Sequence, residues 1–292
     1  MRRRLKGFFY LLVVAMLITA CSSVQKVIKT GDPELIYEAG VEHYNAEEWS
    51  RATTLFSTVE RLYVGTARED TLSFYMARCR AKTGDYYTAI ERLEKFRGEF
   101  GRSVFLEDAE SMYVMCHYYL SPGPTRDQTV TNQTITAAYE FMSRYPESER
   151  NVNFEIIIAE LKDRLYEKSY INAYTYYKIG RYKSAIVAFR NAMKEYPEST
   201  RREDLSYYVV ASSYELAKNS VPYKQLDRYI AMLDSYYTFV GEFPNSDYSK
   251  KVDKMAMEAK KFIAENESAP REERGEEHRS EQLEQLEQYN QY

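Results

Sequence analysis

The side chains that could carry chemistry are few in this chain of 292 residues. Its cysteines and histidines are Cys21, Cys79, Cys116, His43, His117 and His278. They are scattered, without a CxxC pair or a His/Cys cluster at the spacing of metal ligands, so we expect neither a metal nor a cofactor. No carboxylate pair, nucleophile motif or phosphate-binding loop stands out. The sequence therefore favours a protein that is not an enzyme.

Cys21 is the exception, because the residues before it predict a chemical role for it. A basic start at residues 2–6 precedes an uncharged run of 13 residues, Phe8 to Ala20. That run is too short to span a bilayer, which takes about 20 residues, and it predicts a signal peptide. Its end, Ile18-Thr19-Ala20-Cys21, resembles the lipobox of bacterial lipoproteins. We expect Cys21 to be lipidated; the alternative is an ordinary signal peptide with an incidental cysteine.

Lipid on Cys21 would anchor a soluble body to a membrane surface. Each buried methylene contributes about 0.8 kcal/mol and a single chain anchors only marginally, so stable attachment takes more than one chain. The residue after the cysteine is Ser22. Aspartate at that position often marks retention in the inner membrane, so serine favours the outer membrane.

Cys79 and Cys116 are the cysteines that remain for the folded body. An exported, oxidising compartment permits a disulfide between them. Both lie in aromatic-rich segments that we expect to be helical, which favours small buried residues instead. The sequence leaves both possibilities open.

The composition indicates helices and argues against nucleic acid as a partner. The formal net charge is −4, whereas nucleic-acid-binding domains are basic. Tyrosine is abundant, with 29 residues, while there are only 11 glycines and 8 prolines. Few helix breakers and many aromatic residues are typical of helices that pack through aromatic contacts.

A short signature recurs along the chain and predicts helix hairpins. It reads EEWSRA from Glu47, GDYYTA from Gly84 and GRYKSA from Gly180. Each copy has a tight turn, an aromatic residue that we expect to fill the gap between two helices, and an alanine that permits close packing. The copy from Tyr166 to Pro197 matches the tetratricopeptide (TPR) pattern, including its A-x3-F step and closing proline.

Three closures, RYPES, EYPES and EFPNS, mark the ends of hairpins. Their serines are Ser148, Ser199 and Ser246. Proline cannot continue a helix and serine favours the start of the next one, so we interpret these motifs as structural rather than ligand-binding. The first hairpin, Pro33 to Val64, lacks such a closure.

These patterns divide the chain into four parts. We expect a signal peptide at 1–20, a tether at 21–31 and an all-α superhelical solenoid of about five TPR-like hairpins at 32–264. The tail at 265–292 is charged and Gln-rich and has almost no core residues, which predicts disorder. Its EQLEQL spacing hints at a helix, but the heptads are too few for a coiled coil.

The lipobox, the five hairpins and the closures together resemble the BamD family of outer-membrane protein assembly lipoproteins. The segment from Leu161 to Leu165, followed by GRYKSAIVAFRNAMKEYPES, looks like the fourth repeat of that family. The resemblance implies a non-catalytic lipoprotein at the outer membrane, lipid-anchored and facing the periplasm. It implies docking on a BamA-like barrel protein with POTRA domains and receipt of unfolded outer-membrane proteins. The tail has no counterpart in this resemblance.

A TPR superhelix binds through the first helix of each hairpin, which faces the concave groove. Tyrosine suits such a groove because it offers contact area and a hydroxyl at low rotamer cost. The predicted groove residues, any of which could instead pack between helices, are Tyr37, Val41, Tyr44, Phe74, Arg78, Tyr170, Tyr174, Tyr177 and Lys178.

Two other functions share features of this sequence. One is another TPR lipoprotein of the envelope, either a pilotin or a cell-envelope coordinator. The other is a SusD-like glycan-binding lipoprotein, although Trp49 is the chain's single tryptophan and occupies a packing position.

Overall fold

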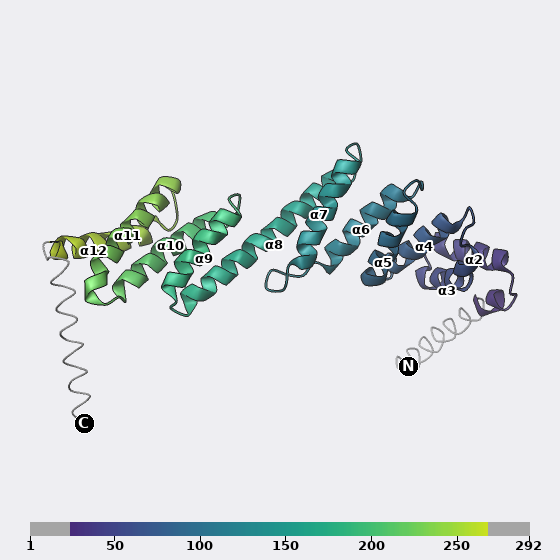
Figure 1. Ribbon diagram of the computed structural model, residues 1–292, viewed down its shortest axis with the longest axis horizontal. Coiled ribbons are helices and arrows are strands. Elements are labelled where there is room, and N and C mark those ends of the chain that lie inside the picture. The colour runs from purple at the N-terminus through teal and green to yellow at the C-terminus, as the bar shows by residue number, and fades with distance from the viewer. Residues whose placement is uncertain (1–23, 268–292) are drawn as a thin grey trace, which may run out of the picture. The chain divides into compact units, whose positions relative to one another are not determined.

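The computed structural model describes residues 24–267, and this part of the chain is helical with no strand. The first three hairpins pair α2 (Pro33–Asn45) with α3 (Trp49–Val59), α4 (Glu69–Lys82) with α5 (Tyr86–Glu99), and α6 (Leu106–Leu120) with α7 (Thr129–Arg144). A short 3-10 turn, Glu60–Leu62, follows α3. Figure 1 shows each pair lying side by side. The all-α architecture of helix hairpins is as predicted.

The chain forms two compact units. The first holds the described residues up to 122 together with 126–159, and the second holds 123–125 and the described residues from 160 on. The boundary falls within the long helix α8 (Asn151–Lys178). The second unit continues with α9 (Tyr182–Glu195), α10 (Arg202–Lys218), α11 (Pro222–Glu242) and α12 (Ser249–Asn266).

The turn signature has the structure that its residues predict. Gly84 and Gly180 take positive φ angles of 80° and 71°, where a residue with a Cβ is strained. Ala89 and Ala185 are fully buried and let the paired helices approach. The first hairpin places Glu47 at this position, with φ 59°. In all three copies, a residue in the left-handed conformation therefore precedes the second helix, whether that residue is glycine or glutamate.

A second close approach occurs within the first hairpin, at Gly40. A Cβ at this position would lie 2.5 Å from the ring of Phe56, which is itself fully buried. The absence of a side chain at Gly40 therefore seats the Phe56 ring directly against α2.

The closures share one hydrogen-bond pattern, and it occurs five times. In the first bond, the backbone carbonyl of the aromatic residue accepts from the backbone N–H of a serine or threonine three residues later. In the second bond, the hydroxyl of that serine or threonine accepts from the backbone N–H two residues after it. The aromatic and hydroxyl residues are Tyr63 and Thr66, Phe100 and Ser103, Tyr145 and Ser148, Tyr196 and Ser199, and Phe243 and Ser246. The structural interpretation of the three proline closures is confirmed. The first two hairpins close in the same way without proline.

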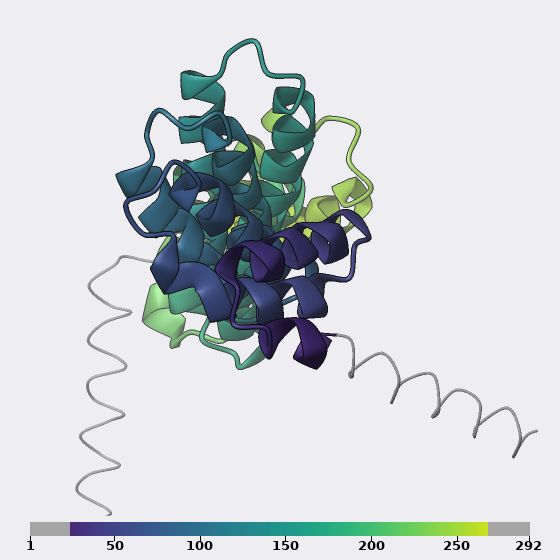
Figure 2. The ribbon, with the colours of Figure 1, turned by 90° about the vertical axis from the view of Figure 1, so that its right-hand side faces the viewer.

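Three segments differ from what the sequence suggests. Helix α8 begins at Asn151, 15 residues before Tyr166, where we placed the start of the fourth hairpin. Helix α12 was not assigned from the sequence at all. Residues 24–28, within the predicted tether, are helical, and Val24 is buried against the first hairpin. Figure 2 shows this turn in the darkest purple, beside the first hairpin.

Among residues 24–267, no helix combines the length and the apolar character needed to cross a membrane. The signal-peptide and lipidation predictions, Cys21 included, fall outside the described residues. The predicted disordered tail also falls outside them from residue 268 onward.

Candidate functional site

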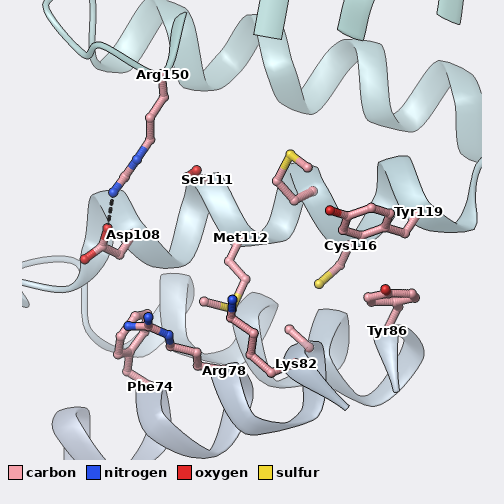
Figure 3. Close-up of a pocket in the computed structure, with 12 residues that line it drawn as sticks. Phe74, Arg78, Lys82, Tyr86, Asp108, Ser111, Met112, Cys116, Tyr119 and Arg150 are labelled. Atoms are coloured by element: carbon pink, nitrogen blue, oxygen red, sulfur yellow. Dashed lines mark hydrogen bonds and ion pairs between the residues drawn. The ribbon is translucent and has the colours of Figure 1, made fainter. Parts of the chain in front are cut away.

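A hollow of about 430 Å³ opens in the first unit between α4 and α6, the first helices of the second and third hairpins. Figure 3 shows its walls. The lining residues come from α4, the start of α5, α6 and the turn before α8: Phe74, Arg78, Ala81, Lys82, Tyr86, Asp108, Ser111, Met112, Met115, Cys116, Tyr119 and Arg150. First helices of successive hairpins form the binding face of TPR proteins, so the hollow lies where such a fold binds extended chains.

Two cations on the α4 wall have no carboxylate partner among the described residues. Arg78 and Lys82 are four residues apart, so their side chains leave the same face of the helix. Arg78 lies over the ring of Tyr44, with its guanidinium carbon 5.6 Å from the ring centroid, and the Lys82 ammonium lies 6.0 Å from that of Trp49. In Figure 3 the Lys82 side chain extends toward Met112, whereas that of Arg78 extends toward Phe74. Their charge remains available to an anionic group.

The one acid of the hollow is already neutralised. Arg150 forms an ion pair with Asp108, and a second guanidinium nitrogen lies 3.6 Å from Glu107. Figure 3 shows Arg150 reaching down to Asp108 from above the α6 wall. Because this pair cancels the acidic charge, the net charge of the hollow is positive.

The rest of the wall is apolar and adaptable. Met112 and Met115 of α6 line it beside Phe74. Tyr86 stacks on Tyr119, with ring centroids 5.0 Å apart and planes 23° apart, and 56% of Tyr119 is exposed. Methionine side chains reshape to fit different partners, and tyrosine offers a flat face for stacking. The wall therefore suits aromatic and aliphatic side chains of varied shape.

Three of the predicted groove residues belong to the core. Tyr37, Tyr44 and Phe74 are 9%, 7% and 2% exposed. Tyr37 packs on Tyr63, Tyr44 stacks on Tyr75 at 4.1 Å, and Phe74 stacks on Phe105 at 4.8 Å. Burial raises the pKa of Tyr44 to about 12. These rings have little surface to offer a partner, although Phe74 also borders the hollow. The neighbouring Val41 is half-buried against the same core.

The remaining predicted residues meet in the second unit. Tyr170, Tyr174 and Tyr177 are half-buried along α8, and their ring centroids lie 6.1, 4.9 and 5.1 Å from that of Tyr208 on α10. Lys178 is exposed, with its ammonium 5.8 Å from the Tyr174 centroid. Tyr208 also stacks on Phe189, and burial raises its pKa. The structure thus brings this predicted set together around a residue that the sequence analysis did not select.

Several residues of the hollow were missed as well, and the sequence held part of the signal. Lys82 follows Arg78 by one helical turn. Met112, Met115 and Tyr119 repeat at the three- and four-residue spacing of one α6 face. Arg150 carried no such signal, because it belongs to a closure and reaches the hollow only through the fold.

The side chains of the hollow suit binding. No group of metal-ligating side chains gathers within residues 24–267. The hollow combines paired cations with a soft aromatic and methionine wall, which fits a peptide that carries a carboxylate beside bulky apolar side chains.

Comparison with known proteins identifies the family. The family model of YfiO, described as outer membrane lipoprotein, matches residues 29–225 and 169–270. The chain belongs to the YfiO family. These matches cover nearly all of the described residues. Relatives of the chain carry the name BamD. The resemblance drawn from the lipobox and hairpins is confirmed, and the match favours this family over the pilotin and SusD-like alternatives.

The relatives are distant in sequence, but the matches cover most of each chain. The chain is 23% identical over 219 residues to the outer membrane protein assembly factor BamD of Caulobacter vibrioides, and the match covers 71% of each chain. It is 22% identical over 268 residues to that of Pasteurella multocida, covering 88% of this chain and 84% of the relative. It spans 65% of the putative BamD of Aquifex aeolicus, at 24% identity.

Among solved structures, the chain is similar to TPR proteins at low scores. The TPR2AB domain of yeast Sti1, in its pHSP90 complex, has a TM-score of 0.35 at 15% identity over 78% of this chain and 98% of that one. The P58(IPK) TPR domain has a TM-score of 0.38 at 12% identity, over 84% and 69%.

Proposed function

We propose that this protein is a non-catalytic scaffold of the machinery that assembles β-barrel proteins in the outer membrane. Membership of the YfiO family supports a role at the outer membrane, and the name of the relatives, outer membrane protein assembly factor BamD, supports a role in assembly. The chain would dock on a BamA-like barrel protein through that protein's POTRA domains and receive unfolded outer-membrane proteins. It would be held by lipid on Cys21 and face the periplasm.

The observation that carries the receiving role is the pair of free cations, Arg78 and Lys82, beside the methionine and tyrosine wall. Outer-membrane strands alternate apolar and polar residues and are rich in aromatic residues near the membrane interfaces. An unfolded chain that ends in such a strand presents a carboxylate next to aromatic side chains. The hollow complements both features, and its shallow, adaptable wall suits transient binding.

A peptide titration tests this role. A fluorescent peptide of alternating apolar and polar residues, ending in an aromatic residue with a free carboxylate, is titrated with the full chain. Charge-assisted hydrogen bonds contribute about 1.5–3 kcal/mol, so the double variant Arg78→Ala/Lys82→Ala is expected to bind at least about tenfold more weakly. Amidation of the peptide's carboxylate is expected to weaken its binding to the native chain by a similar factor. It should not weaken binding to the double variant any further.

The matched control replaces two exposed arginines of the same unit, Arg61 and Arg102, which form no ion pair with another described residue. This control removes the same amount of positive charge away from the α4 wall, so it should leave the affinity unchanged. Equal losses in both variants would mean that net charge alone attracts the peptide. Unchanged binding in the Arg78→Ala/Lys82→Ala variant would remove the hollow from the proposal.

Anchoring and docking need separate measurements. Cys21→Ser should release the protein from the membrane fraction, and mass spectrometry of the native amino terminus should detect acyl chains. Purification of the lipidated protein in mild detergent should recover a barrel protein with POTRA domains. Recovery of none would contradict the docking role and leave the peptide result unaffected.

A further inference from the structure

The last described helix, α12, carries a cationic stripe on the side that faces away from the core. Lys250, Lys254 and Lys261 lie four, seven or eleven residues apart, which at 100° per residue places them on one face. Met257 lies on the same face and is 64% exposed. The opposite face is buried through Val252, Ala256 and Ala259. We call the outward set, Lys250, Lys254, Met257 and Lys261, the lysine stripe.

The acids of α12 leave two lysines of this stripe, Lys250 and Lys254, without an ion pair. Asp253 accepts a hydrogen bond from the Tyr236 hydroxyl at 2.9 Å, and Glu258 accepts one from the Tyr214 hydroxyl. Glu265 lies 3.9 Å from Lys261. Within the described part of the chain, Lys250 and Lys254 have no carboxylate within ion-pair distance. An exposed methionine between charged lysines is therefore a face that still lacks a partner.

The chain itself contains a segment with complementary chemistry directly after this helix. Residues 268–292 hold seven glutamates against three arginines and one histidine. Within this segment the glutamates Glu281, Glu284 and Glu287 alternate with Leu283 and Leu286. The family model ends at residue 270, so this acidic segment is an addition to the matched fold. An acidic, leucine-bearing segment matches a stripe of lysines around a methionine.

We propose that the acidic segment 281–287 docks on the lysine stripe of its own chain. Its glutamates pair with Lys250 and Lys254, and its leucines cover Met257. Only 13 residues separate Glu267 from Glu281. At about 3.3–3.6 Å per extended residue this is ample to fold back along α12, whose 18 residues span about 27 Å.

The short connection makes a weak contact sufficient. Closing a loop of this length costs little more than closing a shorter one, and a tethered partner reaches an effective concentration in the millimolar range. The docked segment then shields the cations of α12 from other anions. It acts as a built-in competitor for any acidic surface that approaches the carboxy-terminal helix.

Carbodiimide crosslinking of the full chain tests the contact, because the reagent joins lysine amines to carboxylates that lie in contact. The chain is mixed in equal parts unlabelled and labelled with ¹⁵N, and the crosslinked peptides are identified by mass spectrometry. Crosslinks from Glu281, Glu284 and Glu287 are expected to concentrate on Lys250 and Lys254, to join peptides of one label only, and to fade as added salt shortens the screening length.

The variant Lys250→Glu/Lys254→Glu is expected to lower the crosslinking of segment 281–287 to Lys261 by about fivefold, because a pair of repelling charges replaces two attractive ones. The matched control, Lys183→Glu/Lys194→Glu, changes two exposed lysines of α9 in the same unit. They too form no ion pair with another described residue, and their replacement should have no effect. Circular dichroism and thermal melting confirm that both variants fold, since all four side chains are exposed.

Three outcomes would overturn the proposal. Crosslinks spread evenly over Lys183, Lys194 and the stripe would mean that the segment has no site. Crosslinks that join labelled to unlabelled peptides would assign the stripe to a second copy of the chain. Absence of these crosslinks in the chain alone, with protection of Lys250 and Lys254 from acetylation only when phosphatidylglycerol vesicles are added, would assign the stripe to an anionic membrane surface.

Discussion

The Ser148 hydroxyl donates a hydrogen bond to the Glu107 carboxylate at 2.7 Å, and its oxygen accepts one from the backbone N–H of Arg150 at 3.4 Å. The Ser148 side chain thus hydrogen-bonds both the backbone just before α8 and the first turn of α6, 41 residues earlier. Ser103 joins Asp70 in the same way at 2.8 Å. The closures therefore connect consecutive hairpins as well as ending one.

Replacing Ser148 with alanine should destabilise the first unit. The substitution removes a hydrogen bond to a charged acceptor and leaves the backbone N–H of Arg150 without its acceptor, so we expect a loss of about 1–2 kcal/mol in the free energy of unfolding. Chemical denaturation followed by circular dichroism measures it. Ser143→Ala, at an exposed serine near the end of α7, is the control and should change little. Equal stability of the two variants would contradict the connecting role.

The three hairpin turns predict opposite effects of glycine. Glu47 holds a φ of 59°, which costs a residue with a Cβ roughly 1 kcal/mol, so Glu47→Gly should stabilise the protein by up to about that amount. Gly180→Ala places a Cβ at φ 71° and should destabilise by a similar amount, although the site itself has open space around it. Melting temperatures measure both. A gain from Gly180→Ala would mean that unfolded-state entropy outweighs the strain.

Local patterns predicted the hairpins because each signature acts locally. The signature consists of a glycine turn, a fully buried alanine such as Ala89 and an aromatic closure. Each of these constrains only a few neighbouring residues, so a single copy is enough to identify a hairpin. The same reasoning failed for α12, which has neither a turn signature nor a proline closure of its own. It also failed for the start of α8, because Asn151 begins a helix that continues past the point where a typical repeat would start.

Placing the site from the sequence was harder, because exposure depends on neighbours that are distant along the chain. Tyr44 and Tyr174 look alike as tyrosines on first helices. Tyr44 is covered by Tyr75 of the next hairpin, whereas Tyr174 is only half-covered by Tyr208. Helical spacing identifies a face but does not reveal what packs against it. The hollow's Arg150 is the extreme case, since the fold alone carries it to Asp108.

The contact between Glu34 and Arg68 predicts an acid-dependent contribution to stability. The guanidinium of Arg68 at 2.5 Å, helped by the Tyr63 hydroxyl, holds the pKa of Glu34 below its ordinary 4.5. A lowered pKa in the folded state means that the contribution is complete above the ordinary value and is lost as the pH falls through the folded one. Glu34→Gln should therefore lower the melting temperature near neutral pH, and the difference should shrink as the pH falls through the lowered pKa of Glu34.

The effect should be small, because the pair is exposed and screened by salt. The matched control is Glu38→Gln, at an exposed carboxylate of the same helix that forms no ion pair with another described residue. It should melt like the native chain at neutral and at acid pH. A difference for Glu34→Gln that persisted undiminished in acid would instead indicate that packing of the side chain, rather than its charge, connects α2 to Arg68.

The two cysteines of the described body predict an unreactive pair of thiols. Cys79 and Cys116 are free rather than joined, and both are buried. Burial raises the pKa of the Cys79 thiol to about 11 and that of Cys116 to about 12. The thiolate is the reactive form, so near pH 8 far less of either buried thiol is ionised than of a free cysteine thiol. Restricted access to the buried sulfurs slows the reaction further.

Alkylation with iodoacetamide near pH 8 should therefore be slower by at least about a hundredfold in the native chain than in the same chain unfolded in guanidinium. The measurement uses the Cys21→Ser variant, so that these are the chain's only thiols, and mass spectrometry locates the label. Cys116 borders the hollow, which makes it the sharper test. Cys79 packs from α4 into the core that it shares with the first hairpin, outside the hollow. Fast native labelling at Cys116 with slow labelling at Cys79 would therefore mean that the wall between α4 and α6 opens in solution.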